Sequence, residues 1–147
     1  MRTLMLLAVV AGLACWTAPQ AAQAQVADAI NLTNQAVKDL TDYPGEGKRY
    51  TAYNSPEDFN KTWGADVRNM KKANGELTEA LAKAKAANID KKGIQLLEMA
   101  IGYGNASEHK EQRLSAQGAL FYLCKANNQE PKDICEKVPK YGSYTAP

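Results

Sequence analysis

The chain of 147 residues is almost neutral, with 18 basic and 16 acidic side chains. Its length fits one domain preceded by a short targeting segment. Binding of nucleic acid through bulk electrostatics needs a dense basic surface, which a net charge of +2 argues against. We therefore expect no nucleic-acid partner.

The N-terminus has the pattern of a cleavable signal peptide. Arg2 supplies one positive charge, and an apolar run follows over residues 4–14. This run is too short to cross a bilayer, which needs roughly 20 residues. The small-residue motif over residues 22–24 predicts cleavage before Gln25. The sequence thus predicts a signal peptide over 1–24 and a single mature domain over 25–147, located in the periplasm or secreted.

A second cleavage site competes with this one. Gly12, Leu13 and Ala14 precede Cys15 and partly resemble a bacterial lipobox, although Gly12 replaces the usual large aliphatic residue. A diacylated Cys15 would anchor the protein to a membrane through its lipid chains. Release after cleavage before Gln25 is the preferred interpretation, and membrane attachment is expected only with lipidation at Cys15.

Cleavage before Gln25 leaves two cysteines, Cys124 and Cys135. An even number of cysteines in an oxidising compartment indicates a disulfide. Their spacing does not match the two-residue spacing of zinc or thioredoxin-like motifs. We expect a structural bridge that stabilises the fold by roughly 2–3 kcal/mol through loop closure.

The first half of the mature chain predicts two helices. Apolar residues of 26–41 recur at helical spacing, and the Pro- and Gly-containing stretch 42–54 interrupts them. Ser55 and Pro56 then form a strong helix start, with two acids in the first turn. The apolar stripe beyond them keeps its phase across Gly75, which favours one long helix over 56–88. A break at Gly75 stays open, because glycine costs about 1 kcal/mol there relative to alanine.

The second half predicts two further helices and a short last one. Asp90 is expected to cap a helix whose buried face carries Ile94, Leu97 and Ile101, widened by Leu96 and Met99. Residues 102–105 are interpreted as a turn, and Ser107 as the cap of a central helix that is apolar nearly all round in its second half. Pro131 begins a short helix, and the tail 141–147 is expected to be loose. The fold class is therefore all-α, a small antiparallel bundle of four to five helices with one disulfide.

Little in the sequence points to catalysis or a cofactor. His109 is the only histidine and lies in a charged turn, so we expect it to be solvated. No pattern of metal ligands, haem attachment, nucleophile elbow or glycine-rich phosphate loop is present, so no metal or cofactor is expected. Two carboxylates distant in sequence could still meet in space, as glycan-cleaving enzymes require. Acceptor motifs for N-glycosylation at Asn31, Asn60 and Asn105 are interpreted as coincidence.

Tyrosines are the least ordinary feature of the composition, with seven Tyr against two Phe. Tyr43, Tyr50 and Tyr53 cluster in one stretch between two predicted helices. Tyrosine offers a large contact area with a polar tip and is enriched at recognition surfaces. These residues are candidates for a partner-binding surface, and the alternative is that they cover the end of the bundle.

The leading hypothesis is an exported, non-enzymatic helical protein that binds a protein partner in the cell envelope, such as an inhibitor, an immunity-type protein or an accessory protein. Export, small size, the disulfide and the tyrosine-rich stretch support it. A second hypothesis is a small envelope enzyme that acts on glycan through two carboxylates. A third is a carrier of a small apolar ligand in the bundle core.

Overall fold

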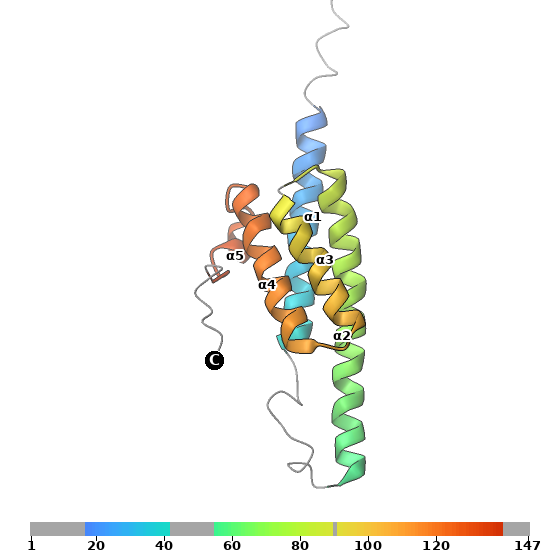
Figure 1. Ribbon diagram of the computed structural model, residues 1–147. Helices are drawn as coiled ribbons and strands as arrows, with labels where there is room; N and C mark the ends of the chain where they lie inside the picture. The colour runs from blue at the N-terminus through green and yellow to red at the C-terminus, as the bar shows by residue number, and fades with distance from the viewer. Residues whose placement is uncertain (1–16, 42–54, 90, 140–147) are drawn as a thin grey trace, which may run out of the picture.

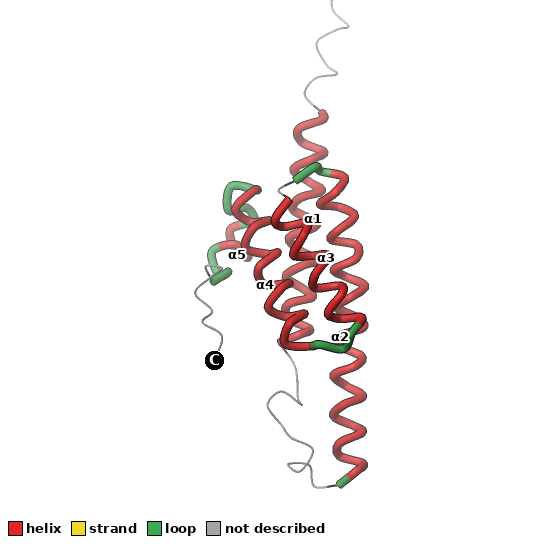
Figure 2. The backbone as a smooth tube through the Cα atoms, in the orientation of Figure 1, coloured by secondary structure: helices red, strands yellow, loops and turns green. Residues whose placement is uncertain are grey.

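The computed structural model describes residues 17–41, 55–89 and 91–139. They form five helices, which are α1 (Thr17–Thr41), α2 (Pro56–Ala86), α3 (Lys91–Asn105), α4 (His109–Ala126) and α5 (Lys132–Cys135). No strand occurs in this part of the chain (Figure 2).

The first four helices run alternately up and down (Figure 1). Each packs against two neighbours, with α1 beside α2 and α4, and α3 beside α2 and α4, so they close into a ring around one core. The short α5 packs on α4. The predicted all-α antiparallel bundle is therefore confirmed.

The start of α2 confirms the prediction made from its sequence. Ser55 is extended, and its hydroxyl accepts a hydrogen bond of 3.1 Å from the backbone N–H of Asp58, while Pro56 occupies the first turn. The helix continues through Gly75 without a break. It ends at Ala86, and Asn88 turns the chain with a φ of 51°.

The connection between α3 and α4 differs from the prediction. Residues 102–105 belong to α3, and the turn lies over 106–108. Ser107 does not cap α4, because it takes a φ of 59° within the turn and Glu108 occupies the N-cap position. The interpretation of Gly102 and Gly104 as turn residues was wrong, since α3 tolerates both within its last turn.

The core has the alternating three- and four-residue spacing typical of helices that pack side by side. In α1 the buried positions include Ala29, Thr33, Ala36 and Leu40; in α2 they are Asp66, Met70, Ala73, Leu77, Ala80 and Ala84; in α4 they include His109, Gln112, Ala116, Ala119 and Leu123.

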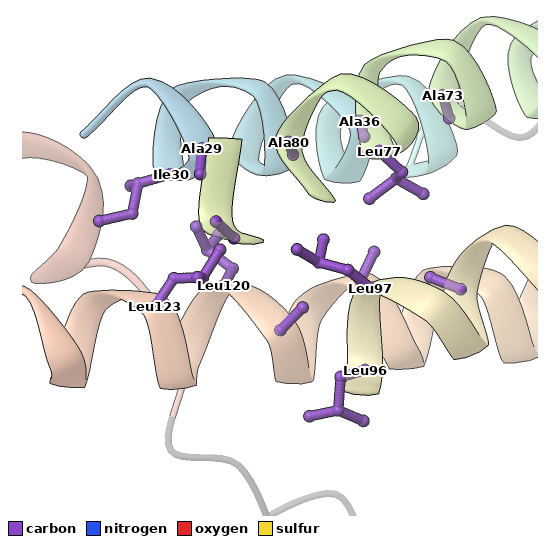
Figure 3. Packing of buried hydrophobic residues seen from close by; sticks show 14 of the residues in the cluster. Ala29, Ile30, Ala36, Ala73, Leu77, Ala80, Leu96, Leu97, Leu120 and Leu123 are labelled. Carbon is purple, nitrogen blue, oxygen red and sulfur yellow. The ribbon is translucent and has the colours of Figure 1, made fainter. Parts of the chain in front are cut away.

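Alanines line the contact between α1 and α2. Ala29 and Ala36 on α1 lie along the same contact as Ala73 and Ala80 on α2, and leucines such as Leu77 fill the centre of the bundle (Figure 3). All four alanines are fully buried. Such small side chains let two helices approach closely, so this contact depends on short interhelical distance rather than on large side chains.

The end of α4 is tied to α5. The sulfur atoms of Cys124 and Cys135 are 2.03 Å apart and their Cα atoms 5.5 Å apart, which confirms the predicted disulfide. Both cysteines are buried. The bridge therefore holds the short α5 against the central helix.

Helix α1 spans the expected cleavage site before Gln25. The helix begins at Thr17, and over residues 20–41, where side-chain burial is described, its buried residues lie at Val26 or beyond. These buried residues all follow the expected cleavage site. Of the helices described, none combines the length and apolar character needed to cross a membrane.

Candidate functional site

A polar cluster lies at the end of the bundle where α3 passes into α4. The Asn74 amide on α2 donates to Oδ1 of Asn105 on α3 (2.8 Å), and Gln112 Nε2 on α4 donates to Oδ1 of Asn74 (2.9 Å). Gln112 is completely buried. The cluster therefore joins three helices through side-chain amides.

Gly104 makes room for this cluster. A Cβ atom at this position would overlap the side-chain amides of Asn74 and Gln112. The absence of a side chain at Gly104 is thus what lets α3 approach the hydrogen bond between α2 and α4. No such constraint applies at Gly75 or Gly102, where a Cβ atom would meet nothing within 4 Å.

His109 is buried, with 5% of its surface exposed, so the prediction that it is solvated was wrong. The reason lies in its phase on α4. Gln112 follows His109 at a spacing of three, and the alternation of three and four continues through the buried Ala116 and Leu123. The charged residues next to His109 suggested an exposed position, although the helical period places His109 on the buried face of α4. Asp66 on α2 is buried as well, four residues before Met70 in the buried stripe of that helix.

Two carboxyl groups distant in sequence meet between α1 and α2. The Lys72 ammonium lies 2.9 Å from Oδ2 of Asp39 and 3.8 Å from Oε1 of Glu76. Both acidic side chains are only 17% exposed, whereas that of Lys72 is 60% exposed. One solvated cation therefore faces two largely buried carboxyls.

The protonation of this group follows from its surroundings. Burial, then the charge of Asp39 and a hydrogen bond to its carboxyl, together raise the pKa of Glu76 to about 7, while the charge of Lys72 opposes them. The hydrogen bond to Asp39 raises the pKa of Lys72. Near neutral pH the Glu76 carboxyl is thus partly protonated.

The chemistry open to this pair is limited by its closeness. Glycosidases hold their two carboxyls about 5–9.5 Å apart, which leaves room for the sugar or a water. Asp39 and Glu76 instead lie on either side of one cation, the Lys72 ammonium, which contacts both. The arrangement is that of an acidic pair bridged by one lysine, which joins α1 to α2. Within the described residues, no group of three or more His, Cys, Asp or Glu side chains is placed to hold a metal ion.

The first half of α2 extends beyond the other helices (Figure 1). At a rise of 1.5 Å per residue, its 31 residues span about 46 Å, against about 22 Å for the 15 residues of α3. Trp63 is 42% exposed and Val67 39% exposed on this segment. The apolar stripe predicted for α2 is continuous, but no other helix of the described residues lies beside its beginning to bury these two side chains (Figure 1).

Other predicted residues are only partly placed. Met99, expected to widen the buried face of α3, is 41% exposed, whereas Leu96 is buried as expected. The partner-binding candidates Tyr43, Tyr50 and Tyr53 lie outside the described residues. The same holds for the expected cap Asp90, for Cys15 and for the tail 141–147.

Comparison with known proteins yields no match among family models, curated proteins or solved structures.

Proposed function

We propose that the protein is an exported, non-enzymatic helical protein that binds a protein partner in the cell envelope, as an inhibitor, immunity-type or accessory protein. The observation that carries this proposal is the extended first half of α2, which presents Trp63 and Val67 to solvent. Exposed aromatic side chains are enriched at protein interfaces, where tryptophan contributes strongly to affinity.

Three further features support the proposal. The N-terminal segment has a signal-peptide pattern, and the first buried residue within the described side chains is Val26, after the expected cleavage site. The disulfide between Cys124 and Cys135 suits an oxidising compartment. Tyr50 and Tyr53 stand just before α2 in the sequence and remain candidates for the same surface.

The experiment is affinity capture of the protein, with crosslinking, from the envelope of its own cells. We expect the Trp63→Ala/Val67→Ala variant to lose about tenfold or more of partner recovery, because it removes the central apolar contacts. Met99→Ala is the matched control, since Met99 is similarly exposed but lies on α3. Circular dichroism of each variant verifies that folding is intact. Equal recovery by the wild type and the double variant would exclude this face.

A second candidate function is an envelope enzyme that acts on glycan through Asp39 and Glu76. The observation in its favour is that two carboxyls meet and that the pKa of one is about 7. The Lys72 ammonium that contacts both carboxyls counts against their use in glycoside cleavage. Release of soluble fragments from purified cell-wall glycan, abolished by Glu76→Gln, would establish the enzyme; no release by the wild type would exclude it. The ligand-carrier hypothesis remains a prediction.

A further inference from the structure

The exposed side of the first half of α2 carries two adjacent rows of side chains. Trp63, Val67 and Lys71 follow one another at intervals of four residues, so they form one row along the helix. Lys61, Gly64 and Arg68 follow at intervals of three and four and form the next row. These six residues are called the basic α2 face below.

Cations without acidic partners flank the apolar centre of the basic α2 face. Lys61, Arg68 and Lys71 are all exposed, and no ion pair within the described part of the chain involves them. Lys72, by contrast, points to Asp39. The face therefore carries three positive charges that form no ion pair with any described residue, beside Trp63 and Val67, on a chain whose overall charge is close to zero.

Gly64 shapes the centre of the basic α2 face. A Cβ atom there would lie 3.4 Å from Nη1 of Arg68, so the Arg68 side chain runs back along the helix over the glycine. The guanidinium group thus lies within the face, along the row of Lys61 and Gly64. In this place it can form paired hydrogen bonds with a carboxylate of a bound protein.

We propose that the basic α2 face binds an acidic protein segment, one that presents apolar side chains flanked by Asp or Glu. This inference rests on the proposed function and specifies the chemistry of its partner. The face extends over about 15 Å from Lys61 to Lys71, which suits a short segment. Such a contact is at the small end of protein interfaces, so we expect binding that is reversible and sensitive to salt.

A membrane surface fits the basic α2 face less well than an acidic protein. Helices that lie on membranes bury a broad apolar face together with their basic residues. Trp63 and Val67 provide only two exposed apolar side chains here, and Phe59, one turn earlier, is half-buried. Nucleic acid would require a longer basic surface than three cations provide.

Binding to defined peptides tests the inference. A fluorescent helical peptide of about 18 residues, with a leucine stripe flanked by Glu, is compared with the same peptide carrying Lys in place of Glu and with vesicles of phosphatidylglycerol. We expect the Glu peptide to bind at least about tenfold more tightly than the Lys peptide, with the difference shrinking between about 50 and 300 mM salt. Equal binding of both peptides, or preference for the vesicles, would overturn the inference.

Two triple variants with the same change in net charge separate this face from bulk charge. K61E/R68E/K71E should reverse the preference toward the Lys peptide, whereas K110E/K125E/K132E, which alters exposed lysines of α4 and α5, should leave it unchanged. An equal effect of both variants would refute a role of the face. Trp63→Ala should weaken binding of the Glu peptide about fivefold or more, with Met99→Ala as its control.

The two proposals can fail separately. If envelope capture is lost in Trp63→Ala/Val67→Ala but persists in K61E/R68E/K71E, the protein binds a partner there and the acidic chemistry is wrong. If the peptides discriminate as expected but envelope capture does not depend on Trp63, the acidic preference stands and the proposed function falls. A carbodiimide crosslink from Lys61 or Lys71 to a carboxylate of the captured partner would support both, because this reagent joins only groups in direct contact.

Discussion

Replacement of Glu76 by Gln should make the protein more stable at alkaline pH. The folded state holds the Glu76 carboxyl next to that of Asp39 with a pKa of about 7, against 4.5 as its ordinary value. The folded state thus binds this proton more tightly than the unfolded chain, so stability rises as the pH falls from above 7 toward 4.5. Above pH 7 the Glu76 carboxyl of the wild type is ionised next to Asp39, with only the exposed Lys72 ammonium beside them. The folded state of the wild type is therefore least stable there.

The magnitude follows from the pKa difference. One pKa unit corresponds to about 1.4 kcal/mol, so the upper limit of the stability that Glu76→Gln gains above pH 7 is about 3.4 kcal/mol. Because the Glu76 side chain is still 17% exposed and Lys72 is largely solvated, screening lowers the expected gain to about 1–2 kcal/mol. Glutamine resembles the protonated acid, so this gain should vanish near pH 5.

Urea denaturation at pH 5 and pH 8.5 measures this difference. Glu79→Gln is the matched control, since Glu79 is exposed on the same helix and should show no comparable dependence on pH. A free energy of unfolding for Glu76→Gln that differs from the wild type equally at both pH values would refute the reasoning. So would a lower stability of this variant at pH 8.5.

Three other predictions concern stability and are measured by the same denaturation assay. Gly75→Ala should stabilise the fold by about 0.5–1 kcal/mol through helix propensity. Gly104→Ala should destabilise it by about 1–3 kcal/mol, because the added methyl group meets the amide cluster. A destabilising Gly75→Ala or a stabilising Gly104→Ala would contradict this packing. Reduction of the Cys124–Cys135 bridge should cost about 3 kcal/mol, and mass analysis after alkylation without reductant should find no free thiol in these two residues. Asn74→Ala should cost about 1–3 kcal/mol because it leaves the Gln112 amide buried without its acceptor, and an unchanged midpoint would exclude a structural role for the cluster.

Features that depend on residues close together in the sequence were predicted correctly. The Ser55 cap, the uninterrupted α2 and the pairing of two cysteines each depend on residues close in sequence or on a simple count. Helical period alone also gave the all-α bundle, because apolar residues recur on one face of each segment.

Features that depend on phase or on distant contacts were missed. The burial of His109 follows from its spacing to Gln112 and Leu123, but the charged residues around it suggested a solvated turn. The end of α3 was placed too early, because glycines were interpreted as turn residues although one of them serves close packing. The exposure of Trp63 depends on which helix lies beside it, which periodicity does not specify.

The candidate functional residues could be predicted from the sequence only in part. The sequence allowed that two distant carboxylates meet, but it did not identify Asp39 and Glu76, because their meeting depends on the register between α1 and α2. The cations of the basic α2 face are visible in the sequence. Their common side follows from helical spacing, and it takes the assembled bundle to show that no described acidic residue pairs with them.

The alanine contact between α1 and α2 has a consequence for how this protein can diverge. Substitution of Ala29, Ala36, Ala73 or Ala80 by a larger residue would push the two helices apart, since all four side chains are fully buried. Surface residues face no such restriction. Distant descendants of the same ancestor would therefore share a spacing of small residues, seven apart on two successive helices, long after their other residues had changed.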